Sequence, residues 1–178
     1  GTNNVGKLGE LLAKARARGA GRRRAPVSAL DLPPRRGATV TDVPDRVTSR
    51  APQLRAFVPI MYGCDKFCTF CIVPQTRGRE RSRPSDEVIA EIEGLARAGT
   101  REVTLLGQTV NSYGKNLAEG RVPFARLLER IADIDGIERI RFTSPYPRDF
   151  TDDLIETIAR LEKVCRHVHL PLQVADDD

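Results

Sequence analysis

The chain has 178 residues, which is enough for one domain with a sizeable buried core and a smaller appendage. None of its apolar stretches approaches the roughly 18 residues needed to cross a bilayer, so we expect a soluble, cytoplasmic protein with no membrane partner. Tryptophan is absent and only 5% of the residues are aromatic, which argues against a broad base-stacking surface.

The net charge of +5 is unevenly distributed along the chain. Residues 1–50 hold 11 Lys and Arg against 4 Asp and Glu, a net of +7, whereas residues 51–178 hold 18 against 20, a net of −2. A basic leader of this kind attracts phosphate groups. A solvated linker that is rich in arginine explains the same pattern, and we favour it because a charge run without a fold carries little specificity.

The first segment is predicted to form a short helix that is capped by Asn4 and stopped by Gly19. Its apolar face consists of Val5, Leu8, Leu11, Leu12 and Ala15. Between residues 20 and 54, repeated proline, glycine and arginine break this periodicity and indicate a linker.

Short apolar runs then alternate with longer amphipathic segments. The runs predict four strands, at 56–61, 102–106, 138–142 and 168–172. Pro59 in the first run marks an edge strand or a bulge. The amphipathic segments predict three helices, one from the cap Ser85 to the stop Gly99, one over 122–131, and one that begins at the cap Thr151. This β-α-β-α-β-α-β series predicts an α/β fold with a parallel sheet and right-handed crossovers.

Cys64, Cys68 and Cys71 form a C-x3-C-x2-C triad. Three thiolates with this spacing can hold three irons of a [4Fe–4S] cluster and leave the fourth iron open to a small molecule. The tight spacing and the lack of a secretory signal disfavour disulfides. A zinc site needs four ligands, and the other candidates stand about a hundred residues away: Cys165, His167 and His169. We therefore favour an iron–sulfur site over zinc.

The motifs around this triad resemble those of the radical S-adenosylmethionine (SAM) methylthiotransferases, and most closely those of the MiaB-type branch, the tRNA-2-methylthioadenosine synthases. The resemblance is weak over 1–18 and good over 55–173. It rests on FVPIMYGC at 57–64, IVPQTRGRERSRP at 72–84, LGQTVNSYG at 106–114, RFTSPYP at 141–147 and HLPLQ at 169–173.

This resemblance implies the first half of a partial (β/α)6 radical SAM barrel, preceded by a short helix and a Pro/Arg-rich linker. The implied domains are the end of an N-terminal methylthiotransferase domain at 1–19, a linker at 20–54 and a partial radical SAM core at 55–178. In barrels of this kind, sites form at the C-terminal ends of the strands. The motifs follow that rule, because each of them stands just after a predicted strand.

The implied cofactors are a [4Fe–4S] cluster on the three cysteines and SAM on its fourth iron, with an electron donor such as flavodoxin or ferredoxin. The candidate SAM-binding residues are neutral hydrogen-bonding groups at the predicted barrel mouth: Gln108, Asn111, Ser144 and Gln173. Helix and loop capping explains such residues equally well. No catalytic residue is identified.

Several other polar residues near these motifs have two interpretations. The alternating arginines after the triad can hold substrate phosphates or the SAM carboxylate, or form a solvated face: Arg77, Arg79, Arg81 and Arg83. Cys165 is interpreted as a structural thiol, and His167 and His169 as packing residues or polar lining of the barrel rather than metal ligands.

The family reaction is thiomethylation at carbon 2 of N6-isopentenyladenosine next to the tRNA anticodon. Family members hold a second cluster with three cysteines in an N-terminal domain, whereas no cysteine precedes Cys64 here. They also continue beyond the last motif with more barrel and an RNA-binding domain. We therefore expect an incomplete enzyme that acts on tRNA. The alternatives are a methylthiotransferase for an aspartate of a ribosomal protein, and a non-catalytic iron–sulfur or RNA-binding module.

Overall fold

A computed structural model of the protein describes residues 7–17, 53–117 and 120–171. Helix α1 spans Leu8–Ala17, and none of its residues is buried. The predicted cap Asn4 and nearly all of the predicted linker lie outside the described residues. In the described part of the chain, no helix combines the length and the apolar character needed to cross a membrane.

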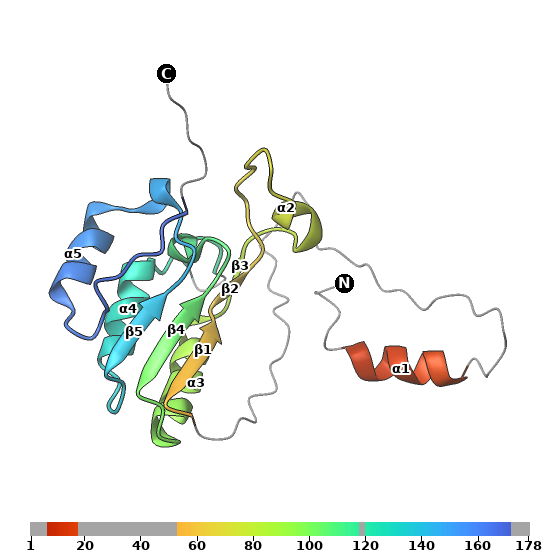
Figure 1. Cartoon of the computed structure of the whole chain (residues 1–178), viewed down its shortest axis with the longest axis horizontal. Helices are drawn as coiled ribbons and strands as arrows, with labels where there is room; N and C mark the ends of the chain where they lie inside the picture. The colour runs from red at the N-terminus through yellow and green to blue at the C-terminus, as the bar shows by residue number, and fades with distance from the viewer. Residues whose placement is uncertain (1–6, 18–52, 118–119, 172–178) are drawn as a thin grey trace.

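Three parallel strands form the main sheet in the order β1-β4-β5. Strand β1 covers Arg55–Pro59, β4 covers Glu102–Leu106 and β5 covers Arg139–Phe142. Figure 1 shows the three strands side by side and pointing the same way. The predicted parallel α/β fold is therefore confirmed. Pro59 is the last residue of the edge strand β1, a position that tolerates its missing N–H.

Three helices cover one face of this sheet (Figure 1). They are α3 (Ser85–Arg97), α4 (Phe124–Ala132) and α5 (Asp152–Arg160). Each connects one strand to the next position in the sheet, because parallel strands need a crossover of this length.

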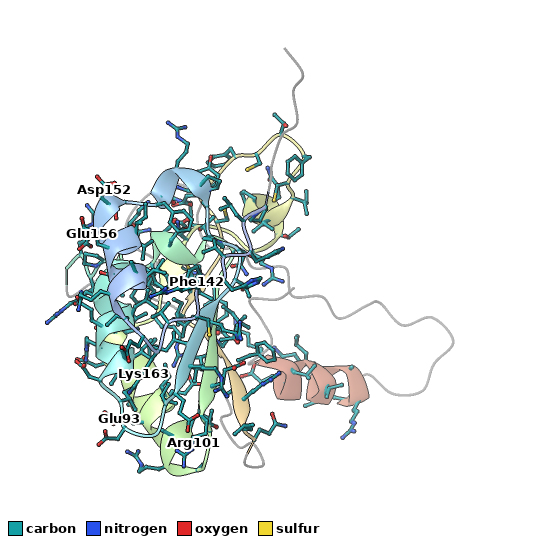
Figure 2. All side chains as sticks on the ribbon, turned by 60° about the vertical axis from the view of Figure 1, so that its left-hand side comes forward. Glu93, Arg101, Phe142, Asp152, Glu156 and Lys163 are labelled. Carbon is teal, nitrogen blue, oxygen red and sulfur yellow. The ribbon has the colours of Figure 1, made fainter. Side chains whose placement is uncertain are left out.

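Alternation along each strand builds the core under these helices. Val58, Leu105 and Phe142 align across the sheet, and none is more than 3% exposed. The ring of Phe142 meets that of Phe124 edge to face, with 5.5 Å between the centroids. Figure 2 shows Phe142 inside the molecule, whereas Asp152 lies on the outer side of α5.

Two of the three predicted helix signals that lie in the described residues are confirmed. Gly99 follows α3 with φ of +100°, a conformation that glycine adopts without strain. The hydroxyl of Thr151 accepts a hydrogen bond from the backbone N–H of Leu154 at 3.3 Å and caps α5. The prediction that Ser85 caps α3 is wrong. Pro84 occupies that position, and the Ser85 hydroxyl accepts a hydrogen bond from Arg130.

The first predicted strand is interrupted after Pro59. Met61–Tyr62 forms a separate short strand, β2, which pairs antiparallel with β3 (Arg81–Ser82). Figure 1 places this ribbon beyond the C-terminal end of β1. The loop that carries the cysteines leaves β2 and returns to β3, so the ribbon holds both ends of that loop.

The prediction of a strand at 168–172 is wrong over its described residues, 168–171, which form no strand. The chain meets the sheet earlier, through a parallel bridge between Val164 and Ile140. Val164 is 2% exposed, whereas Val168 and Leu170 are 39% and 49% exposed. The position beside β5 goes to Val164, which is buried there, because burial of an apolar side chain is favourable.

Candidate metal centre

The cysteine loop starts with a backbone turn at Gly63. This residue has φ of +74°, and a side chain there would collide with the carbonyl oxygen of Arg79. The backbone N–H of Cys64 donates to the carbonyl of Gly78 at 3.1 Å. The two ends of the loop therefore lie in contact, and only glycine fits at this crossing.

Cys64, Cys68 and Cys71 line one cavity of about 200 Å³, and all three are free thiols. Cys64 is buried and the other two are half-buried. The backbone N–H of Cys71 donates to the carbonyl of Cys68 at 3.0 Å, which closes a tight turn between them. Across the described residues, no three Cys, His, Asp or Glu side chains are arranged around a single metal ion.

Other parts of the cavity wall come from the loops after β4 and β5. Gln108 and Thr109 follow β4, and Ser144, Pro145 and Tyr146 follow β5. The C-terminal ends of the parallel strands therefore bring the three sets of predicted residues together, as the sequence predicts.

Two of the predicted SAM-binding residues have unusual features in this cavity. The Oε1 atom of Gln108 is buried and has no hydrogen-bond partner in the described part of the protein. Ser144 has φ of +55°, a rare conformation for a residue other than glycine. Unpaired buried polar atoms and strained backbone are costly, and both tend to occur where a ligand binds.

The other two predicted SAM-binding residues are not part of this cavity as described. The Asn111 amide donates to the Tyr146 carbonyl at 2.8 Å and accepts from the Tyr146 N–H at 2.7 Å. Asn111 thus ties the loop after β4 to the loop after β5. Gln173 lies outside the described residues, although Pro171 lines the cavity.

Cys64 has polar neighbours of both kinds. Burial raises the pKa of its thiol, while the backbone N–H of Lys66, which lies 3.3 Å from Sγ, lowers it. The nearby carboxylate of Glu80 raises the pKa further. Glu80 is itself buried and accepts a hydrogen bond of 2.6 Å from Thr109, a cavity residue. No pattern in the sequence predicts this pairing, because Glu80 and Thr109 belong to different motifs.

The predicted arginine strip is not a single face. Arg79 donates two hydrogen bonds to Asp65 within the cysteine loop, at 2.6 and 2.9 Å. Arg81 and Arg83 are buried, and Arg83 pairs with Glu91 at 2.6 Å. The interpretation of a solvated or phosphate-binding strip is therefore wrong for these two arginines. The alternation misled because the β2–β3 ribbon turns them into the protein.

Three further candidate ligands near the end of the chain do not line the cavity: Cys165, His167 and His169. Cys165 is half-buried and its N–H donates to the carbonyl of Ile140 at 3.0 Å, next to the bridge that replaces the predicted strand. His167 and His169 are exposed. None of the three lines this cavity.

Sequence reasoning missed an acidic residue that joins the loops around the cavity. Asp149 accepts hydrogen bonds from Lys66, Ser112 and Lys115 at 2.8 to 2.9 Å. Asp149 lies two residues beyond the motif RFTSPYP at 141–147. Lys66 is visible in the sequence between Cys64 and Cys68, but no spacing pattern pairs it with an aspartate as distant as Asp149.

The donor set of this cavity fits an iron–sulfur cluster with a small ligand. Three thiols on one loop supply soft ligands, and a tight glycine turn brings the backbone close to them. The unpaired Gln108 oxygen leaves one polar group for a second molecule.

Comparison with known proteins agrees with this reading. The chain is 49% identical, over 99% of its length, to a tRNA-2-methylthio-N(6)-dimethylallyladenosine synthase of Syntrophomonas wolfei, and covers 37% of that protein. It is 56% identical, over 70% of its length, to a synthase of the same name in Clostridium botulinum, and covers 27% of it. The chain thus spans about a third of the length of these curated relatives.

Among solved structures, the chain resembles the radical S-adenosylmethionine methyltransferase TsrM from Kitasatospora setae. One structure, with cobalamin and a [4Fe-4S] cluster bound, matches at a TM-score of 0.48 and 24% identity, over 64% of this chain and 21% of that chain. A second, with tryptophan and a SAM analogue, matches at 0.49 and 23%, over 76% and 25%.

Residues 58–178 match the sequence profile of the Radical SAM superfamily. The match confirms the resemblance inferred from the motifs and includes all three cysteines of the triad. The predicted cofactors, a [4Fe–4S] cluster and SAM, agree with it. Because the match covers more than half of the chain, this protein belongs to the radical SAM superfamily.

Proposed function

We propose that this chain is the cluster-binding part of a radical SAM methylthiotransferase that acts on an N(6)-dimethylallyl adenosine in tRNA. Cys64, Cys68 and Cys71 hold a [4Fe–4S] cluster by three of its irons. The observation that carries the proposal is the cavity in which these three thiols meet the unpaired oxygen of Gln108.

The cavity residues have separate roles in this proposal. The chemistry that the bound cluster supplies is one-electron cleavage of a carbon–sulfur bond in SAM, which yields a 5′-deoxyadenosyl radical. Gln108 accepts a hydrogen bond from the amino group of SAM, which satisfies its buried oxygen. The strained turn at Ser144 presents its hydroxyl and the adjoining backbone to the same ligand.

Gln173 remains a candidate for the same ligand, since Pro171 places the end of the described chain at the cavity wall. Asn111 contributes indirectly, because its amide fixes the backbone of Tyr146, a cavity residue. The electron comes from a reduced donor protein such as flavodoxin or ferredoxin.

The choice of tRNA over a ribosomal protein follows from the relatives. Proteins that are 49% and 56% identical to this chain are named as tRNA-modifying synthases. The chain covers only about a third of each relative, so the tRNA substrate is proposed for the full-length protein.

Anaerobic reconstitution with iron and sulfide tests the proposal. We expect about four irons per chain and, after reduction, an electron paramagnetic resonance signal that changes when SAM is added. Dithionite and SAM should then yield 5′-deoxyadenosine. A cluster signal that ignores SAM contradicts the radical SAM function, and purified protein that holds zinc in place of iron contradicts the cluster assignment.

The substrate needs its own measurement. In the full-length protein that contains this chain, tRNA that carries N(6)-dimethylallyladenosine next to the anticodon should accelerate 5′-deoxyadenosine formation more than the same tRNA without that modification. Equal rates with both tRNAs, or acceleration by ribosomal protein alone, contradict the tRNA assignment.

A further inference from the structure

The carboxylate of Asp149 accepts hydrogen bonds from three side chains. Lys66 Nζ and Ser112 Oγ donate to Oδ2 at 2.8 and 2.9 Å, and Lys115 Nζ donates to Oδ1 at 2.8 Å. The Asp149 side chain is only 12% exposed. Charge-assisted hydrogen bonds of this length in a shielded place are among the stronger polar contacts in proteins.

These partners come from all three loops at the C-terminal edge of the sheet. Lys66 lies in the cysteine loop beyond β1, and Ser112 and Lys115 lie beyond β4. Asp149 itself ends the 3-10 helix η3 (Pro147–Asp149) beyond β5. A single carboxylate therefore joins the cysteine loop to the two loops that form the opposite walls of the cavity.

Lys66 connects this junction to a cluster ligand. Its ammonium is bound by Asp149 and lies 4.7 Å from the centre of the Tyr146 ring, and its side chain is 22% exposed. Its backbone N–H donates to Sγ of Cys64 at 3.3 Å. Anchoring the side chain fixes the residue whose backbone orients the sulfur, which is the arrangement that tunes metal sites through residues beyond the ligands.

The Asp149 carboxylate is ionised at neutral pH. Burial tends to raise its pKa, but the hydrogen bonds from Lys115, Lys66 and Ser112 outweigh this effect and lower the pKa.

We propose that Asp149 is a positioning residue for the cluster: through Lys66 it holds the cysteine loop against the loops after β4 and β5 and thereby fixes the sulfur of Cys64. This inference rests on the proposed cluster. It assigns to Asp149 and Lys66 a role beyond that of a surface ion pair, since one partner lies between two cluster ligands in the sequence.

Lys115 provides a matched control, because it binds the same carboxylate at the same 2.8 Å from outside the cysteine loop. The test compares K66M, D149N and K115M in the anaerobically reconstituted chain. We measure the rate at which a ferrous chelator removes iron, with thermal unfolding of each variant as the check on folding. K66M and D149N should lose iron about three to ten times faster than the unaltered chain, and K115M within about twofold of it.

Two further variants separate positioning from charge. K66R keeps the ion pair and should restore iron retention to within about twofold. K66M removes a positive charge and D149N removes a negative one, so they should shift the reduction potential of the cluster in opposite directions while both speed iron loss. In the double variant K66M/D149N, iron loss should be no faster than in the worse single variant.

The inference is overturned if D149N retains iron as well as the unaltered chain, or if K115M loses it as fast as K66M. It is also overturned if K66M and D149N change the iron-loss rate in opposite directions, since the change in charge alone then explains both effects. Failure of the unaltered chain to take up iron is a different result, because it rejects the proposed cluster itself.

Discussion

At the N-terminal ends of the three strands, Glu102 lies within 3.5 Å of Arg55, Arg139 and Arg141. At the C-terminal ends of the same strands, three free thiols surround a cavity in which Gln108 leaves a buried oxygen without a partner among the described residues. At the N-terminal end of the sheet, here called the paired end, the charged groups bind one another. At the C-terminal end, here called the open end, polar groups remain for a ligand.

This difference separates structural polar groups from functional ones more clearly than residue type does. Glu102 is only 6% exposed on its side chain, and a buried acid in a barrel invites a catalytic interpretation. Its three arginine partners account for it fully, since a buried charge is stable when it is paired. The buried Oε1 atom of Gln108 has no such partner among the described residues.

The largest effect should come from breaking the open end. C68A should reduce the iron content of the reconstituted chain from about four per chain to less than about one, because a half-exposed ligand is lost with little cost to folding. C165A is the control, since Cys165 is equally half-buried but lies away from the cavity. Iron and sulfide analysis measures both. Equal loss of iron in the two variants would contradict the assignment of the triad.

Breaking the paired end should affect stability and leave the cluster intact. E102Q removes the charge that holds the three arginines together and should lower the free energy of unfolding by about 1 to 2 kcal/mol, a modest value because the arginines are 40% to 73% exposed. Denaturant unfolding measures the loss. If the iron content of E102Q falls as it does in C68A, the two ends of the sheet are not independent.

Replacing Gln108 at the open end should have the opposite effect to E102Q, because it should weaken ligand binding and leave stability unchanged. Q108M keeps the size of the side chain and removes the buried amide, so the stability of the chain should stay the same or rise slightly. Binding of SAM should weaken about fivefold to tenfold, which corresponds to about 1 kcal/mol for one lost hydrogen bond. Titration of the electron paramagnetic resonance change with SAM tests this. Unchanged SAM binding with a large loss of stability would show that Gln108 is structural.

The smallest effect should be the pH dependence of the paired end. The hydrogen bond from Arg139 lowers the pKa of Glu102, and the neighbouring charges of Arg55 and Arg141 contribute in the same direction. A carboxylate whose pKa is lowered by folding stabilises the fold fully at pH values above its ordinary pKa, which is 4.5 for Glu102. This contribution is lost as the pH falls through the pKa of the folded state. The stability difference between the unaltered chain and E102Q should therefore be constant near neutral pH and shrink below about pH 4.5. A difference that grows in acid contradicts the pairing.

The sequence by itself determined the elements whose patterns are local. The β4 strand matches its predicted bounds, 102–106, because its apolar run is bordered by clear helix stops and turns. The Thr151 cap and the glycine after α3 are likewise local signals. The cysteine spacing indicated an iron–sulfur site, and the ordered motifs identified the superfamily.

Only the tertiary structure decided which distant residues meet. Hydropathy placed a strand at 168–172, yet the bridge to β5 forms at Val164, because the position depends on what the helix end can reach. The alternation of the arginines predicts either an anion-binding strip or a solvated face, yet two of them are buried beside the β2–β3 ribbon. The contact between Lys66 and Asp149 arises only when parallel strands bring their loops to one edge. Hydrophobic periodicity in the sequence predicts which residues are buried. Which polar groups pair across the sheet depends on the tertiary fold, because their partners lie far apart in the sequence.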